Sequence, residues 1–306
     1  MKLCLFNVEN LFLLHTGPGE GYKKPTDKVE WIARTLKEID ADIVMLVEVG
    51  GIHSLDLFNS RYLSDTYFTA LIKGNSDRGI EIGYLINKRL AQFHQIVGHK
   101  ETALEFNYPH EIAESQNTGK KLKGHRFSRD VSELRLSQDG KIEMILLLVH
   151  LKSKLDKEGI DYNGVLRRAA ELKKLVKIYN ERRKDYPGVP VIVAGDFNGQ
   201  AQRNSVDPEF KALYEETDLE DVLEVISEVP ERRFSYFHFN RDFIREASQL
   251  DYIMLPPELH SVVKKEESGI YHYRDPHGVI LPYPQDSFQR YALPSDHYPV
   301  VVKLKI

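Results

Sequence analysis

Short apolar runs recur along the chain at the lengths expected of strands in an α/β protein. The run 146–149 shows no alternation of polar and apolar positions, which is typical of a strand buried on both faces. We expect strands over residues 3–8, 42–47, 81–87, 141–151, 189–194, 250–255 and 300–306.

Apolar residues at three- and four-residue spacing lie between several of these runs and predict helices. Val29, Ile32 and Leu36 mark one face of the first predicted helix, with Thr26 as its expected N-cap. A longer helix is predicted to begin at Val165. Strands that alternate with helices indicate the α/β class, and no internal repeat or low-complexity linker interrupts the pattern.

Polar side chains cluster at the points where the buried strands end. In sheet-based α/β proteins ligands bind outside the strand ends, so these side chains are candidates for a functional site. Packing alone is a poor explanation for so many strand ends that supply Asn, Asp, Glu or His. The residues concerned are Asn7, Glu9, Glu48, His150, Asp196, Asn198, Asp251, Asp296 and His297.

Each of these segments also has an ordinary structural interpretation when it is taken alone. Asp196 and Asn198 follow a Gly at the end of a buried strand, and an Asx turn uses the same residue types. Glu48 ends an apolar strand, where a carboxylate needs a cation or solvent. Asp251 lies inside an apolar strand, where either an imidazole N–H or backbone amides satisfy such a carboxylate.

Taken together, the same residues form a set of hard oxygen ligands and a His–Asp pair. Carboxylates and an amide carbonyl suit Mg²⁺ or Mn²⁺ better than Zn²⁺. A His that is oriented by an Asp can activate water or stabilise developing charge. This combination suits the hydrolysis of a phosphate ester by in-line attack of water.

Composition narrows the possible partners and the cellular compartment. The chain has 306 residues, with 42 Lys and Arg against 46 Asp and Glu, a net charge of −4 that excludes a globally basic nucleic-acid binder. Cys4 is the single cysteine, so neither an intramolecular disulfide nor a cysteine-based zinc cluster can form, and we expect it to be buried. With no apolar run long enough for a membrane span and too short an apolar start for a signal peptide, we expect a cytoplasmic protein.

Seven short motifs resemble those of the endonuclease/exonuclease/phosphatase superfamily, which includes deoxyribonuclease I, abasic-site endonucleases, inositol polyphosphate 5-phosphatases and neutral sphingomyelinases. Their wording is most similar to bacterial nuclease-type members. In chain order they are Phe6-Asn7-Val8-Glu9-Asn10-Leu11-Phe12, Val47-Glu48, Arg78-Gly79-Ile80-Glu81-Ile82-Gly83-Tyr84, Val149-His150-Leu151-Lys152-Ser153, Gly195-Asp196-Phe197-Asn198, Leu250-Asp251-Tyr252-Ile253 and Ser295-Asp296-His297-Tyr298-Pro299.

The resemblance implies a particular α/β fold: a four-layered α/β sandwich in which helices flank two packed mixed β-sheets. Because the motifs extend over almost the whole chain, we expect a single domain over residues 1–306. The resemblance also implies a metal site with Glu48 as the principal ligand, Asn7 and Asp296 close to the ion, and Glu9 near a second metal position.

The same resemblance implies catalytic roles. Asp196 matches the residue that positions or deprotonates the attacking water, and Asn198 its neighbour that holds the phosphate. His297, paired with Asp251, matches the imidazole that contacts the scissile phosphate. His150 resembles the His that deoxyribonuclease I has at this strand end.

Substrate contacts are predicted outside these motifs as well as within them. The segment 117–129 carries three lysines with Arg126 and Arg129 and no acid, which fits either a solvated loop or a phosphate-binding edge. We take Arg126, Arg129, Arg78 and Lys152 as candidate substrate-binding residues, although Arg78 could equally hold a carboxylate. The aromatic- and Arg-rich segment 232–243 could stack bases, but anchoring a loop is the commoner role of such residues.

Three functions remain open at this point. The first is a Mg²⁺- or Mn²⁺-dependent phosphodiesterase that acts on nucleic acid or oligonucleotides. The second is a phosphatase or phosphodiesterase acting on a small phosphorylated molecule or lipid headgroup, which the net charge of −4 favours over long duplex binding. The third is an inactive scaffold that binds phosphorylated partners. We expect no disulfide-linked partner.

Overall fold

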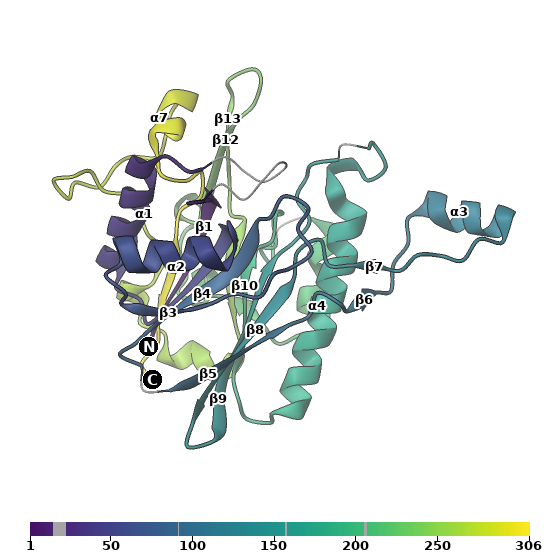
Figure 1. Cartoon of the computed structure of the whole chain (residues 1–306), viewed down its shortest axis with the longest axis horizontal. Coiled ribbons are helices and arrows are strands. Elements are labelled where there is room, and N and C mark those ends of the chain that lie inside the picture. The colour runs from purple at the N-terminus through teal and green to yellow at the C-terminus, as the bar shows by residue number, and fades with distance from the viewer. Residues whose placement is uncertain (15–22, 91, 157, 205–206) are drawn as a thin grey trace.

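The computed structural model describes residues 1–14, 23–90, 92–156, 158–204 and 207–306. Within these residues the strands form two six-stranded sheets and two short two-stranded ribbons (Figure 1). The first sheet has the order β15 (Gly269–Ile270), β16 (Val300–Lys303), β1 (Lys2–Leu11), β2 (Ile43–Val49), β4 (Glu81–Asn87) and β3 (Tyr67–Ala70). The second has the order β11 (Glu220–Asp221), β14 (Asp251–Leu255), β10 (Val191–Asp196), β9 (Lys141–His150), β8 (Val131–Gln138) and β5 (Phe93–Gly98).

Helices flank the two sheets, and the two ribbons lie outside them as separate pairs of strands. The ribbons pair β12 (Tyr236–Phe239) with β13 (Arg245–Ser248) and β6 (Ala103–Leu104) with β7 (His125–Arg126). The α-helices are α1 (Thr26–Ile39), α2 (Gly51–Tyr62), α3 (Pro109–Thr118), α4 (Val165–Asp185), α5 (Lys211–Glu215), α6 (Val222–Val225) and α7 (Ser287–Ala292). Short 3₁₀ turns occupy η1 (Tyr162–Gly164), η2 (Pro208–Phe210), η3 (Pro230–Arg232), η4 (Pro257–Val262) and η5 (Lys265–Glu267).

Alternation along the strands divides the apolar side chains into three packed layers. Leu3 and Leu5 of β1 face Leu146 and Ile192 of the second sheet, so the inner faces of the two sheets form one core. Residues of the opposite parity on the first sheet, together with α1 and α2, form a second core, and those on the second sheet pack against α4. This arrangement of helices, sheet, sheet and helices confirms the expected four-layered α/β sandwich.

Both sheets are mixed, as expected. β1 is parallel to β2 and antiparallel to β16, so strands from the two ends of the chain lie side by side at the middle of the first sheet (Figure 1). β10 is parallel to β9 and antiparallel to β14. No helix in the described part of the chain has the length and apolar character that a membrane crossing requires.

Most predicted elements are confirmed, with shifts at their ends. Cys4 is fully buried against the outer core of the first sheet, as expected. The N-cap prediction for the first helix is wrong: Thr26 is the first helical residue, Pro25 takes the cap position and no side chain caps the helix. Proline is favoured at helix starts because its fixed φ and missing N–H cost nothing there.

The arm of residues 103–126 lies outside the pattern that the strands and helices predicted. The ribbon β6–β7 carries α3 away from the body of the molecule (Figure 1). No residue of α3 is buried, so this helix has no core of its own. We call this segment the α3 arm.

Gly195 allows β10 to approach β9 closely just before the polar end of the strand. Its φ is +153°, and a Cβ built on it would lie 2.0 Å from the carbonyl oxygen of Val149. The backbone of β9 cannot yield without disturbing the sheet. A glycine is therefore required immediately before Asp196.

We expect Gly195→Ala to lower the free energy of unfolding by at least about 2 kcal/mol, because the new methyl group overlaps a strand backbone. Gly124→Ala is the matched control, since nothing lies within 4 Å of a Cβ at Gly124. Chemical denaturation of both variants measures the difference. Similar stabilities for the two would show that β9 and β10 do not need this close approach.

Candidate active site

The polar rim of the site continues the inner faces of both sheets. Asn7, His150 and Asp196 occupy the positions in β1, β9 and β10 that follow inner-core residues at two-residue spacing. Successive side chains in a strand point to opposite faces, so these three side chains point into the space between the sheets. All three are at least 97% buried, with exposures of 1%, 3% and 2%.

Bulges at the ends of β1 and β2 redirect further side chains toward the same place. The register of β2 shifts between Val47 and Val49, and Glu48 between them has a φ of +66°. Glu9, Asn10 and Asn198 also have positive φ, at +45°, +59° and +54°. This conformation is uncommon for residues with a Cβ and marks positions that the surrounding structure holds under strain. The bulge turns the Glu48 carboxylate toward His150 of the other sheet.

These side chains line a cavity of about 640 Å³ at one edge of the sandwich. Its walls come from both sheets and from the β12–β13 ribbon, so segments far apart in the sequence meet there. Among the residues named from the sequence, the lining includes Glu9, Glu48, Arg78, Arg129, His150, Asp196, Asn198, Asp296 and His297. Asn7 and Asp251 lie directly behind this lining.

His297 and Asp251 form the expected pair. Nδ1 of His297 lies 2.7 Å from Oδ2 of Asp251, and the hydroxyl of Ser235 donates to the same carboxylate oxygen at 2.7 Å. Burial alone lowers the pKa of His297, but the Asp251 carboxylate, helped by neighbouring carboxylates, raises it well above the ordinary imidazole value. The charged imidazolium form of His297 is therefore favoured, and its Nε2 lies at the cavity wall, 3.5 Å from the amide nitrogen of Asn7 and 3.9 Å from Oδ2 of Asp196.

Asp196 is held by two hydrogen bonds and has a pKa close to neutrality. The Asn7 amide donates to Oδ2 at 2.9 Å, and the backbone N–H of Asn198 donates to Oδ1 at 2.8 Å. Burial raises the pKa of Asp196 to about 7, against the nearby charge of His297. A carboxylate of this pKa can take a proton from water near neutral pH.

His150 lies between the two carboxylates that face it from opposite sheets. Its Nε2 is 3.7 Å from Oδ2 of Asp196 and 4.0 Å from Oε1 of Glu48. Burial, followed by the charge of Arg129, lowers the pKa of His150 well below the usual value. The neutral form of His150 is therefore favoured, and its Nδ1 is a buried atom without a hydrogen-bond partner among the described residues.

Three carboxylates gather on the other side of the cavity. Arg290 of α7 donates through one Nη2 to Glu9 at 3.1 Å and to Asp296 at 2.6 Å. Burial, then the charge of Asp296, raises the pKa of Glu48, which has no arginine or lysine in an ion pair within the described residues. This is the pattern of donors that a divalent ion with oxygen ligands requires.

The candidate metal residues offer the oxygen donors that a divalent ion prefers, with one difference. Glu48, Glu9 and Asp296 supply the carboxylates, and all three line the cavity. Asn7 is placed differently from the expectation of an oxygen ligand: its Oδ1 accepts from the backbone N–H of Glu9 at 3.0 Å, while its amide nitrogen faces Asp196. Among the described residues, the group whose ligand atoms lie within 4.8 Å of one another is a different one: Asp196, Asp251 and His297.

The candidate substrate residues do not all reach the cavity. Arg78 and Arg129 line it. Lys152 lies outside this lining because its ammonium donates to the carbonyls of Ser153 and Leu155, at 3.1 and 2.5 Å. Arg126 is directed elsewhere, since its guanidinium forms a 2.7 Å ion pair with Glu101 on the exposed ribbon.

The basic segment 117–129 divides between two environments. Its lysines lie on the exposed α3 arm, where Lys120 pairs with Glu114 at 2.9 Å, as in a solvated loop. Arg129 instead turns inward. The aromatic segment 232–243 is divided too: Phe237 is buried in the core, whereas the ring of Tyr236 lies 4.8 Å from that of His297.

Sequence reasoning missed several residues that hold the site together. Arg290 and Ser235 are the clearest, since they fix Glu9, Asp296 and Asp251. Arg290 lies in α7, six residues before Asp296, and no pattern in this part of the sequence indicates that its side chain turns inward. Ser235 lies in an aromatic segment whose only sequence signal is its density of rings.

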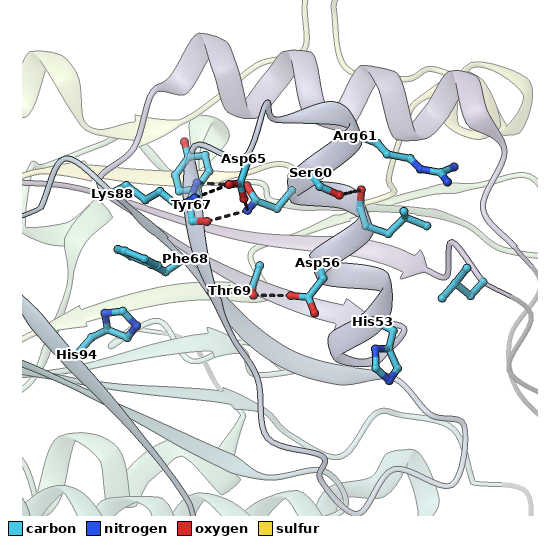
Figure 2. A pocket seen from close by; sticks show the side chains of 13 residues that line it. His53, Asp56, Ser60, Arg61, Asp65, Tyr67, Phe68, Thr69, Lys88 and His94 are labelled. Carbon is cyan, nitrogen blue, oxygen red and sulfur yellow. Dashed lines mark hydrogen bonds and ion pairs between the residues drawn. The ribbon is translucent and has the colours of Figure 1, made fainter.

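A different hollow, of about 730 Å³, lies beside α2 and β3 (Figure 2). Its acids already have partners: Asp56 accepts from the hydroxyl of Thr69 at 2.5 Å, and Asp65 pairs with Lys88 at 2.6 Å. The ring of Phe68 lies against His94, with centroids 5.3 Å apart. This surface lacks the converging buried acids and imidazoles of the candidate active site.

Comparisons with known proteins support the architecture and give no match at the level of sequence. No protein-family profile matches the chain, and no curated protein matches it. Among solved structures, truncated TDP2 from Caenorhabditis elegans is similar with 18% identity and a TM-score of 0.60, over 98% of this chain and 96% of that one.

Two further structures are similar over nearly their full lengths. TDP2 from D. rerio, complexed with a single-strand DNA product, has 16% identity and a TM-score of 0.61, over 99% of this chain and 97% of that one. An endonuclease/exonuclease/phosphatase family protein from Bacteroides thetaiotaomicron has 17% identity and a TM-score of 0.58, over 99% and 93%.

These similarities show that the chain has the fold of a DNase I-like α/β sandwich. More particularly, the chain has the fold of the endonuclease/exonuclease/phosphatase superfamily, as its motifs led us to expect.

We expect Arg290→Gln to lower the melting temperature in EDTA, because Glu9 and Asp296 then lose their neutralising cation beside Glu48. Adding Mg²⁺ should raise the melting temperature of this variant more than that of the parent. Arg61→Gln, at an exposed arginine on α2 outside the active-site cavity, is the control. Equal Mg²⁺ responses in parent and Arg290→Gln would contradict a cation site at these carboxylates.

Asp196 should also make the stability of the metal-free protein depend on pH. Because burial raises its pKa from 3.8 to about 7, the folded state binds a proton that the unfolded chain releases. Stability from this group is therefore gained as pH falls through 7 and lost as pH rises. Asp196→Asn cannot titrate, so its stability should change less than that of the parent between about pH 5 and about pH 8, by on the order of 2 kcal/mol. Denaturant titrations in EDTA measure the free energy of unfolding of the parent and of Asp196→Asn at each pH. Parallel pH profiles for the two proteins would show that the pKa of Asp196 is not raised.

Proposed function

We propose that this protein is a divalent-metal-dependent phosphodiesterase that hydrolyses phosphodiester bonds in nucleic acid or oligonucleotides. The observation that carries the proposal is one cavity that contains a fixed imidazolium, a near-neutral carboxylate and a separate cluster of carboxylates. His297 with Asp251 supplies the first, and Asp196 the second. Glu48, Glu9 and Asp296 form the third.

The protein groups divide the reaction between them. Asp196 accepts a hydrogen bond from Asn7, which orients its carboxylate toward the cavity, where it positions water and accepts its proton. The imidazolium of His297 stabilises negative charge on a non-bridging phosphate oxygen, and Asp251 keeps that imidazole charged and in place. Because the Asp251–His297 bond uses Nδ1, we assign this group to phosphate chemistry and not to metal binding.

The carboxylates of Glu48, Glu9 and Asp296 would hold the divalent ion, with Mg²⁺ or Mn²⁺ as the expected ions. Such an ion supplies positive charge to phosphate oxygens when it is bound. Arg290 already neutralises part of the charge of this cluster, so Glu9 and Asp296 can lie close together with less mutual repulsion. His150, neutral and buried, separates Glu48 from Asp196.

The nucleic-acid assignment is supported by the cations on the cavity wall and by one similar structure. Arg129 and Arg78 line the cavity where a phosphate chain would leave it. The similar D. rerio TDP2 structure is described as a complex with a single-strand DNA product. Single strands suit a protein of net charge −4 better than long duplexes, since fewer phosphates need be neutralised.

A small phosphorylated molecule is the second candidate substrate, and the size of the cavity favours it. At about 640 Å³ the cavity lies within the range that encloses one small ligand. We also propose that residues 1–306 form a single catalytic domain, because the cavity collects side chains from Glu9 to His297. A reducing compartment remains our proposal for where the protein works.

We expect the protein to cleave single-stranded oligonucleotides in the presence of Mg²⁺ or Mn²⁺, and EDTA to abolish this activity. Asp196→Ala and His297→Ala should each lower kcat by about 10²- to 10⁴-fold, because they remove the proton acceptor and the phosphate-facing cation. Product release from single- and double-stranded DNA and RNA, measured by gel or chromatography, is the readout.

The same assay separates the competing functions. His277→Ala, an exposed histidine outside the cavity, is the control for the His297 substitution. Phosphate release from small phosphorylated compounds without polymer cleavage would favour the second candidate. An absence of hydrolysis on every substrate, with binding of phosphorylated ligands retained, would identify an inactive scaffold.

A further inference from the structure

A second cavity of about 500 Å³ adjoins the active-site cavity at the base of the α3 arm. The two cavities share Arg78, Arg129, Ser153 and Leu155, so they are neighbouring parts of one depression. The second cavity is bounded by the start of α3, by β7 and by the loop between β9 and α4. Nothing in the phosphodiesterase mechanism above uses it.

The wall between the two cavities contains a buried arginine with no carboxylate partner. Arg129 is only 7% exposed, and its Nη1 donates to the carbonyl of Leu151 at 3.2 Å and the hydroxyl of Ser128 at 3.3 Å. In the described part of the chain no ion pair joins it to an acid. A buried guanidinium that is bonded only to neutral groups retains donors and charge for an anion.

The second cavity also offers flat rings and apolar side chains. The rings of Tyr108 and His110 stack with centroids 5.7 Å apart and an angle of 15°. Tyr108 is buried and braced by the edge of Phe106 at 4.9 Å, while His110 is exposed. Leu155 and Ile160, 53% and 40% exposed, supply apolar surface in the same cavity.

Three of the five acids that line this cavity, Glu111, Asp156 and Asp161, are engaged by hydrogen bonds within the protein. Glu111 accepts from the imidazole of His125 at 2.8 Å and from the backbone N–H of Tyr108 at 2.8 Å. Asp161 accepts the first backbone N–H groups of α4, from Leu166 and Arg167, both at 2.9 Å. Beside these acids the cavity offers a ring face, apolar surface and the shared Arg129.

We propose that the second cavity binds the nucleotide unit next to the scissile phosphate. The base of that unit lies against His110 and Leu155, and its own phosphate lies at Arg129 between the two cavities. This inference rests on the proposed phosphodiesterase function, because it makes the second cavity the place where an oligonucleotide is distinguished from a single phosphate ester. Stacking tolerates any base, so the cavity requires a base without selecting a sequence.

The test uses single-stranded oligonucleotides from which one base at a time has been removed around the cleaved bond, with the backbone intact. For the parent, loss of the base at one position should raise KM about tenfold and leave kcat nearly unchanged. In His110→Ala this penalty should disappear, because the ring that received the base is gone. His277→Ala is the matched control and should keep the full penalty.

Equilibrium binding separates failure of this inference from failure of the proposed function. Fluorescence anisotropy of labelled intact and base-deleted oligonucleotides, in EDTA, should show the same position-dependent loss of affinity in the parent and not in His110→Ala. A protein that cleaves no oligonucleotide would refute the phosphodiesterase proposal, and the binding data would still test the cavity. A penalty that persists in His110→Ala, or no penalty at any position, would overturn the second cavity as a base site.

Discussion

Two sheets packed face to face determine where chemistry can occur in this protein. Their inner faces are filled with apolar side chains along most of each strand. On β1, β9 and β10 these inner-facing positions end in Asn7, His150 and Asp196 at one edge of the sandwich. Because the strand backbones are fixed by their ladders, these side chains cannot move apart to reach water. Polar groups that would be solvated in an open loop are therefore held a few ångströms from one another. Their charges must be balanced by neighbouring groups or removed by a change of protonation.

Burial acts in opposite directions on the acids and bases of this rim. It raises the pKa of Asp196 to about 7 and lowers that of His150, so one becomes a ready proton acceptor and the other a neutral spacer. His297 escapes this effect because Asp251 lies 2.7 Å away and keeps it charged. The site thus obtains three different protonation behaviours from groups in one cavity. Perturbed pKa values of this kind are typical of functional sites. Buried charged pairs add little net stability to a fold.

Asn7, His150 and Asp196 could be predicted as site residues because buried apolar runs end at them. The face to which each points could not be predicted, because apolar runs such as 146–149 show no alternation. Glu48 could be predicted from its strand end too, but the bulge and positive φ that direct its carboxylate have no signal in the sequence. The Asp251–His297 pair was predictable from chemistry, since a buried Asp needs a donor. Arg290, Arg126 and Lys152 were not, because the direction of a long basic side chain depends on which acid or carbonyl lies within reach, and that is decided by loops without periodicity.

The pairing of β1 with β16 has a consequence for how this protein is made. His297 precedes β16, which pairs with β1, so segments almost 300 residues apart in the sequence must meet before the site exists. Contacts between such distant segments form slowly, because the chain loses the entropy of loop closure before the contacts stabilise it. During synthesis the second sheet can pack around α4 while β1 still lacks one neighbour. The polar rim is then complete only when β16 has paired with β1, because Asp296 and His297 come directly before that strand.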